Sequence, residues 1–135
     1  MTLDLESLET SFDLLAPRGD ELMDEFYSRL FVTAPASRLL FPADPKQQKT
    51  ILLATLVLLR KSLRNLDTIA PTLRKLGACN VAYGAKPEHY DVVVNLLVDS
   101  MREVLGPRSD ERTLDEWRTA LRLVSKQMIA AAEAP

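Results

Sequence analysis

The sequence predicts an all-α protein, and three observations support this prediction. Along most of the chain, apolar residues recur at every third or fourth position, the spacing that places them on one face of a helix. Residues that start or stop helices, such as Asp, Pro and Gly, separate these stretches at short intervals. No stretch alternates convincingly between apolar and polar residues, as a half-buried strand would. Helices with apolar stripes bury them against one another, so we expect several helices around one core.

The composition bounds the domain organisation and excludes several classes of function. The 135 residues fit a single domain over residues 1–135, with no linker, repeat or low-complexity segment, and 47% of them are hydrophobic. The net charge of −2 and the lack of a long basic tract argue against nucleic-acid binding. One Cys permits no internal disulfide. We expect no signal peptide, and the longest apolar run, Ile51–Leu59, is too short to span a bilayer, so a cytoplasmic protein without membrane contact is predicted.

The first part of the chain is expected to form two helices and a short third one. The first helix covers about Leu3–Leu15 and should be broken by Pro17 and Gly19. Asp20 can cap the second helix. The apolar stripe of that second helix consists of Leu22, Met23, Phe26, Tyr27, Leu30 and Phe31. A short helix then follows over residues 33–40.

The next helix is marked by Asp44-Pro45, a capping residue followed by a proline suited to the first turn. It should run to about Leu63 and become heavily apolar after one polar turn. Its apolar residues are Ile51, Leu52, Leu53, Leu56, Val57, Leu58 and Leu59. They cover most of the circumference, so we expect this helix to be buried on more than one side.

Two further helices are expected over residues 68–83, with Pro71 in the first turn, and over Pro87–Leu105, ended by Gly106-Pro107.

The last helix should open with a capping box formed by Thr113 and Glu116 and should run to about Ala132. Its inward residues are expected to include Trp117. The whole chain is therefore predicted to hold six longer helices and one short helix.

The stretch from Leu76 to Tyr90, LGACNVAYGAKPEHY, resembles the joint between the F and G helices of bacterial globins. This group includes Vitreoscilla-type haemoglobins, flavohaemoglobin haem domains and related single-domain globins. Their pattern is roughly Leu-Gly-x-x-His-x-x-Tyr-Gly-Val-x-Pro-Glu-His-Tyr, and its first His binds the haem iron. This chain has Asn80 at that position. The resemblance implies a globin fold, a three-over-three helical sandwich.

Further motifs extend the resemblance over nearly the whole chain. Phe26-Tyr27-Ser28-Arg29-Leu30-Phe31 is similar to the family's Phe-Tyr-x-x-Leu-Phe, whose tyrosine points into the distal pocket. Phe41 resembles the phenylalanine that stacks on the tetrapyrrole. Counting on from it, the distal polar position falls on Gln48 and the apolar position one turn later on Leu52. The alternative for Tyr27 and Gln48 is a locally satisfied buried Tyr and a solvated Gln.

The interpretation of the proximal side, the side of the tetrapyrrole from which the family's His binds the iron, depends on Asn80. A neutral carboxamide is a poor iron ligand, because haem sites use imidazole, thiolate, thioether or phenolate. Asn80, with Leu76 on the same helix face, could instead bond the pyrrole N–H or lactam carbonyl groups of an iron-free linear tetrapyrrole. Two alternatives stay open: Asn80 bonds the backbone or water in a vacant or filled-in pocket, or it is a deliberate replacement of the iron ligand.

Three neighbours of Asn80 complete the candidate site. Cys79 could bond a bilin covalently, as in phycobiliproteins, or it could be a small buried hydrophobe. Tyr90 resembles a tyrosine that supports the proximal His and could bond the Asn80 amide here. His89, the one histidine, resembles a pocket-edge residue that does not bind iron. The presence of a single His also argues against bis-histidine ligation and against a zinc site.

The function predicted from this resemblance is tetrapyrrole binding, with a biliverdin-like bilin, or haem without His ligation, as the cofactor. Two alternatives are a haem globin that binds oxygen or nitric oxide with an unusual proximal side, and a ligand-free interaction domain like the globin-fold modules of bacterial stress signalling. No enzyme is expected, because no nucleophile–base pair and no glycine-rich phosphate loop can be assembled. The partner is then a small-molecule tetrapyrrole, and a homodimer is compatible because bacterial globins often dimerise.

Overall fold

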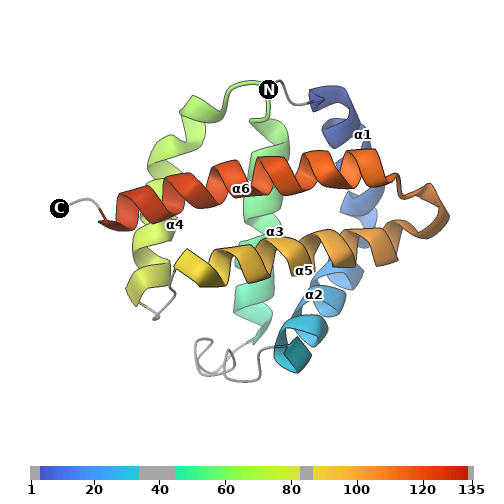
Figure 1. Ribbon diagram of the computed structural model, residues 1–135, viewed down its shortest axis with the longest axis horizontal. Coiled ribbons are helices and arrows are strands. Elements are labelled where there is room, and N and C mark those ends of the chain that lie inside the picture. Colours follow the sequence, from blue (N-terminus) through green and yellow to red (C-terminus); the bar gives the residue numbers. More distant parts are fainter. Residues whose placement is uncertain (1–3, 34–44, 83–86, 134–135) are drawn as a thin grey trace.

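In a computed structural model, the chain is described over residues 4–33, 45–82 and 87–133, with side chains over 4–33, 49–78 and 88–130. Within these residues the structure consists of helices and contains no β-strand, which confirms the predicted all-α fold (Figure 1). The elements are α1 (Leu5–Leu15), η1 (Ala16–Arg18), α2 (Gly19–Thr33), α3 (Pro45–Lys61), η3 (Leu66–Ile69), α4 (Ala70–Ala82), α5 (Pro87–Leu105), η4 (Gly106–Arg108) and α6 (Glu111–Glu133), where η denotes a short 3₁₀ turn.

The helices lie in two crossed layers. In Figure 1, α5 and α6 run side by side in opposite directions across the front, and α2, α3 and α4 cross behind them. The most extensive packing joins α6 to α4, followed by α6 to α5 and α2 to α5. The apolar stripes predicted from the sequence face the space between the layers, so that one hydrophobic cluster includes residues from all six α-helices.

The largest completely buried side chain of this cluster is that of Trp117 in α6. Its ring lies 6.0 Å from that of Phe12, centroid to centroid. Its indole Nε1 donates a 2.8 Å hydrogen bond to Oγ of Ser11, and that hydroxyl donates to the carbonyl of Leu8 at 3.0 Å. The polar atom of the largest core residue is therefore satisfied inside the core, and α1 is joined to α6.

The prediction that α3 is buried on more than one side holds only in part. Leu56 and Leu59 are buried, whereas Leu52, Leu53, Val57 and Leu58 are half-buried against the core. Ile51 is 41% exposed. Among the described elements, α3 makes its main contacts with α1, α2 and η3.

Several predicted boundaries are confirmed. Pro45 and Pro87 are the first residues of α3 and α5, as the tolerance of proline in a first turn predicts. Gly106 follows α5 with a φ of 55°, a left-handed conformation that suits glycine. Residues 68–83, predicted as one helix, instead divide into the 3₁₀ turn η3 and the helix α4, with Pro71 in the first turn of α4.

The predicted capping box of the last helix is wrong. Helix α6 begins at Glu111, and Asp110 caps it by accepting hydrogen bonds from the backbone N–H of Arg112 at 3.3 Å and from the hydroxyl of Thr113 at 3.2 Å. Glu116 accepts a 3.1 Å bond from the backbone N–H of Asp4 instead. The carboxylate of Asp110 reaches the backbone N–H of Arg112, so Asp110 takes the cap position and Thr113 lies inside the helix.

Gly19 also differs from its prediction as a helix breaker. It adopts an ordinary right-handed helical conformation and is the first residue of α2, which places Asp20 inside the first turn rather than at the cap. A Cβ at this position would lie 2.9 Å from Cδ2 of Leu53. The missing side chain of Gly19 therefore leaves room for the Leu53 side chain of α3. The predicted short helix over residues 33–40 lies almost wholly outside the described residues.

Candidate functional site

The structure brings together four of the predicted site residues in one core. Tyr27 of α2 is buried, with 5% of its surface exposed. Leu52 of α3, Leu76 of α4 and Tyr90 of α5 are half-buried and pack against the same hydrophobic cluster. Each comes from a different helix, so the crossed layers of the fold are what gathers them.

The other four predicted site residues cannot be placed to the same detail. Phe41 lies outside the described residues. Gln48 belongs to α3, and Cys79 and Asn80 belong to α4, but their side chains lie outside the described part of the structure. Helix α4 continues to Ala82, so positions 76 and 80 are separated by about one helical turn.

Tyr27 is a neutral hydrogen-bonding group in apolar surroundings. Its ring packs edge-on against Phe26 at 4.9 Å and lies 5.9 Å from the ring of Phe31. Burial disfavours the charged phenolate and raises the pKa of the Tyr27 hydroxyl to about 12. At neutral pH this group is therefore a phenol, which can donate one hydrogen bond and accept another.

Gly77 fixes the position of α4, the helix that carries Leu76 and Asn80. A Cβ on Gly77 would lie 2.4 Å from the backbone oxygen of Met128 in α6, a distance that no real side chain accepts. The two helices therefore meet backbone to backbone at this point. Gly77 was not among the predicted site residues, although a glycine in the middle of a helical pattern is a signal of close packing.

No protein-only metal centre occurs among the described residues. No group of three or more His, Cys, Asp or Glu side chains in this part of the chain is arranged to hold a metal ion. The single histidine, His89, is half-buried in the first turn of α5 beside Tyr90. The prediction that the chain has no zinc site remains a prediction.

The crossed helical layers, with one core reached by side chains from every helix, define a helical sandwich domain. Residues 24–128 match the globin family, and the chain belongs to that family. This confirms the fold class predicted from the motifs. None of the described helices is long and apolar enough to cross a membrane.

The chain is similar to several bacterial flavohemoproteins and globin-like proteins. It is 24% identical to a flavohemoprotein of Bacillus subtilis over 128 residues, which are 93% of this chain and 32% of that protein. It is 26% identical over 125 residues to the flavohemoprotein of Halalkalibacterium halodurans, covering 90% of this chain and 30% of that protein. The chain thus spans about a third of the length of these flavohemoproteins. A globin-like protein of Aquifex aeolicus is 25% identical over 122 residues, which are 90% of this chain and 86% of that protein.

Solved structures agree on the fold. A bacterial globin from Campylobacter jejuni superimposes with a TM-score of 0.86 at 24% identity, covering 96% of this chain and 94% of that chain. An engineered carbene transferase from Rhodothermus marinus gives a TM-score of 0.82 at 24% identity, covering 97% of this chain and 94% of that chain.

Proposed function

We propose that this globin binds a tetrapyrrole between α3 and α4 and holds it without an imidazole from position 80. One observation carries the proposal. Tyr27, Leu52, Leu76 and Tyr90 are gathered in one core, while the position that resembles the family's iron ligand is Asn80. Binding rather than catalysis is the proposed activity.

The described residues are better suited to contact the tetrapyrrole itself than to bind an iron ion at its centre. Leu52 and Leu76 are half-buried on two different helices, so each keeps apolar surface that a flat macrocycle can cover. Burial of that surface contributes about 25 cal/mol per Å². The donor set does not fit a conventional haem iron, because a carboxamide is a poor ligand and the one histidine lies on α5.

A linear tetrapyrrole is the first candidate ligand. It carries pyrrole N–H and lactam carbonyl groups and needs no axial bond. The neutral phenol of Tyr27 can serve as a donor, and the amide of Asn80 offers both a donor and an acceptor. Cys79 is a candidate for a covalent bond to the same ligand.

Haem is the second candidate, because the relatives named flavohemoproteins favour it. In this case the chain would hold haem by apolar burial, with no imidazole at position 80, and could bind oxygen or nitric oxide from the Tyr27 side. When bound, haem would supply the iron that takes up such a gas. Residues Tyr27 and Gln48 would then be the donors to the bound gas.

A titration of the purified protein with biliverdin and, separately, with haemin tests the proposal. We expect biliverdin to give a shifted red absorption band that saturates at one ligand per chain, and haemin to give a broad, weak Soret band. The variant Asn80→His should convert the protein to tight haem uptake with a sharp Soret band and an iron–histidine stretch in resonance Raman spectra. Asn65→His, which adds a histidine outside α4, is the matched control and should behave as the wild type.

Three results would contradict parts of this proposal. Tight haemin uptake by the wild type, without any response to biliverdin, would identify a haem globin with another axial ligand. An unchanged melting temperature with either compound would favour a ligand-free interaction domain, because a ligand that binds the folded state must stabilise it. Separation of the bilin from the denatured wild-type chain, as readily as from the Cys79→Ser chain, would exclude a covalent bond at Cys79.

A further inference from the structure

A cleft lies on the surface at the corner where α1 meets the turn between α5 and α6. Its volume is about 330 Å³, near the lower end of the range for small-molecule sites. This corner and α4 lie at opposite ends of α6 (Figure 1), and none of the residues that line the cleft belongs to the predicted tetrapyrrole site. A ligand of this cleft would therefore bind in addition to a tetrapyrrole.

Hydrogen bonds between distant segments hold the walls of the cleft in place. At the start of α1, the backbone N–H of Asp4 donates to the carboxylate of Glu116 in α6 at 3.1 Å. Just after the end of α1, the guanidinium of Arg18 donates to the carbonyl of Val104 in α5. The cleft is therefore formed before a ligand binds, which lowers the entropy cost of binding.

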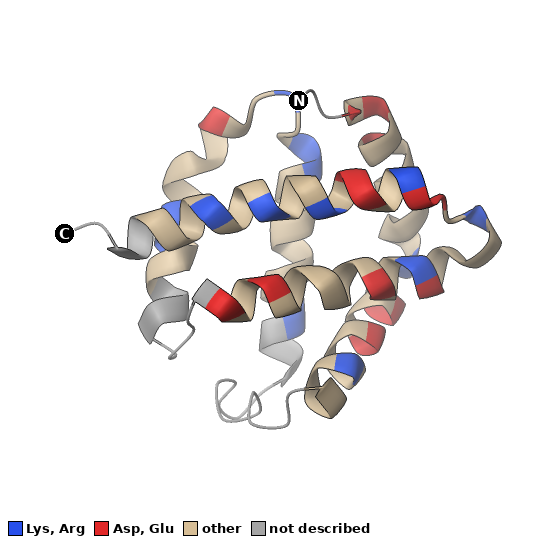
Figure 2. Cartoon of the chain, in the orientation of Figure 1, with Lys and Arg blue, Asp and Glu red and all other residues tan. Residues whose placement is uncertain are grey.

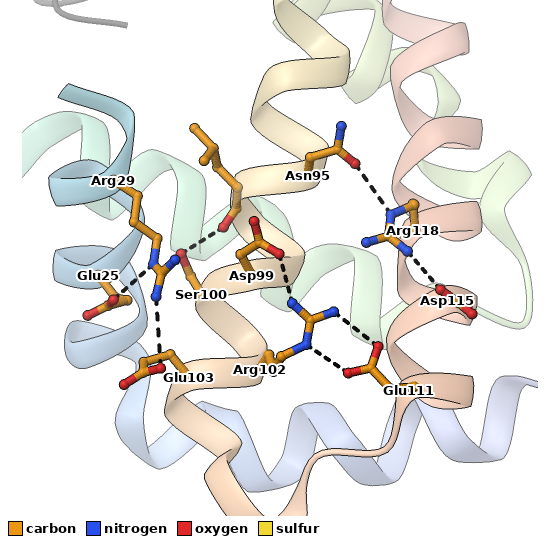
Figure 3. A network of polar contacts seen from close by, with 11 residues as sticks. Glu25, Arg29, Asn95, Asp99, Ser100, Arg102, Glu103, Glu111, Asp115 and Arg118 are labelled. Atoms are coloured by element: carbon orange, nitrogen blue, oxygen red, sulfur yellow. Dashed lines mark hydrogen bonds and ion pairs between the residues drawn. The ribbon is translucent and has the colours of Figure 1, made fainter. Parts of the chain in front are cut away.

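Most charged side chains around this corner already have partners inside the chain. Arg102 binds Asp99 and Glu111, each at 2.8 Å (Figure 3). The carboxylates of Asp4 and Asp110 line the cleft, but each caps the helix that follows it, α1 and α6 respectively. These groups are therefore engaged in holding the fold together.

Two side chains of opposite charge in the cleft lining are not engaged in this way. Glu6 lies in the first turn of α1 and Arg108 lies in η4, and both are exposed. Within the described part of the chain, neither has an ion-pair or hydrogen-bond partner, so they do not pair with each other. Figure 2 shows acidic positions at the start of α1 and a basic position in the turn that joins α5 to α6. The cleft thus offers one negative and one positive charge to a ligand.

The rest of the lining suits a ligand that also has an apolar part. Leu14, which is 38% exposed, and Leu105 give the cleft apolar surface. Thr10 is exposed in the same lining, and its hydroxyl has no hydrogen-bond partner among the described residues. A hydroxyl can both donate and accept a hydrogen bond, so it can meet either end of a polar ligand.

We infer that this cleft binds a small zwitterion with an apolar side chain, such as an aliphatic amino acid. Its ammonium group binds Glu6, its carboxylate binds the guanidinium of Arg108, and its side chain covers Leu14. A simple cation would be repelled by Arg108, and a simple anion by Glu6. Because each ion pair alone is exposed and weak, the ligand needs both charges on one molecule.

Calorimetric titration of the whole chain with L-leucine at neutral pH tests the inference, and we expect one leucine to bind per chain. Leucinol lacks the carboxylate and isocaproate lacks the ammonium group. Each should bind at least about tenfold more weakly, because it loses one charge-assisted contact. The fluorescence of Trp117, the one tryptophan, should change in parallel, since its indole donates to Ser11 in the cleft lining.

Two variants that each remove one charge assign the two ends of the ligand. Arg108→Gln should weaken leucine binding at least about tenfold without weakening the binding of leucinol. Glu6→Gln should weaken leucine binding to a similar extent without weakening the binding of isocaproate. Arg122→Gln and Glu88→Gln are the matched controls, because they remove exposed charges outside the cleft, and both should bind leucine as the wild type does.

A wild type that gives no heat and no fluorescence change with leucine overturns the inference. Unchanged leucine binding by both Arg108→Gln and Glu6→Gln, with helical content confirmed by circular dichroism, overturns it as well. Competition between biliverdin and leucine would place leucine in the tetrapyrrole site and would also overturn it. Because leucine binding is measured without a tetrapyrrole, the result is independent of the proposed function.

Discussion

The indole nitrogen of Trp117 donates a 2.8 Å hydrogen bond to the hydroxyl of Ser11, a residue 106 positions earlier in the chain. The hydroxyl of Ser11 in turn donates a 3.0 Å hydrogen bond to the carbonyl of Leu8. This short chain of hydrogen bonds lies inside the core, and it ties the first helix to the last.

Replacing Ser11 by Ala should destabilise the protein by about 1–3 kcal/mol, because the buried indole N–H loses its acceptor. Chemical denaturation followed by circular dichroism measures the change in the free energy of unfolding. Ser100→Ala is the matched control, since the Ser100 hydroxyl is also buried and bonds within its own helix, to Leu96, at 2.7 Å. Equal costs for the two variants would show that the Trp117 bond contributes nothing.

Replacing Gly77 by Ala should destabilise the protein by about 1–3 kcal/mol through overpacking, despite the higher helix propensity of Ala. The new Cβ would meet the backbone oxygen of Met128, which cannot move aside as a flexible side chain could. Gly106→Ala is a useful comparison, because no atom lies within 4 Å of its Cβ and only its φ of 55° resists the change. A Gly77→Ala protein as stable as the wild type would contradict the close contact of α4 and α6.

Burial of Tyr27 should make the stability fall at alkaline pH. The pKa of Tyr27 is about 12 in the folded protein, whereas an unfolded tyrosine ionises near 10. Between these two values the unfolded chain has lost a proton that the folded chain retains, so unfolding is favoured as the pH rises. The loss approaches 1.4 kcal/mol per pH unit across this window. Denaturation curves from pH 9 to 12 measure it, and Tyr27→Phe should remove this part of the slope.

Glu9 should contribute a stabilising ion-pair network that is lost in acid. Its carboxylate binds Arg64 at 2.7 Å and Arg60 at 3.4 Å, linking α1 to α3 and the residues just after it. The hydrogen bond from Arg64 holds the pKa of Glu9 below its usual value of 4.5. The stabilisation is therefore complete above that value and is lost as the pH falls through the folded pKa.

Glu9→Gln tests this network. The variant should lose stability at neutral pH and should depend less on pH between 5 and 3 than the wild type, as measured by thermal unfolding. Added salt should reduce the difference between the two proteins, because these charges are near the surface. An unchanged acid dependence in the variant would assign that dependence to other carboxylates.

The helix boundaries that the sequence predicts well are those set by local backbone chemistry. Pro45 and Pro87 can begin a helix but cannot sit in its middle, so the positions of α3 and α5 follow from the chain itself. The cap of α6 does not follow in this way. Asp110 and Thr113 are both good capping residues, and only the folded geometry shows that Asp110 takes the role.

In the candidate site, too, some features can be predicted from the sequence and others depend on the folded geometry. The resemblance to bacterial globins identifies Tyr27, Leu52, Leu76 and Tyr90, and the fold places them in one core. The contact between Gly77 and Met128 and the hydrogen bond from Trp117 are long-range relationships between helices. No local pattern encodes them, because each depends on the angle at which two distant segments cross.

The close contact between Gly77 and the backbone of Met128 has a consequence for the evolution of such a protein. Helix α4 is attached to the rest of the molecule by its own main chain, through a contact that no ligand supplies. A lineage in which an iron-binding residue on this helix was replaced would therefore retain the fold. Later substitutions at that site could then favour the binding of a different ligand.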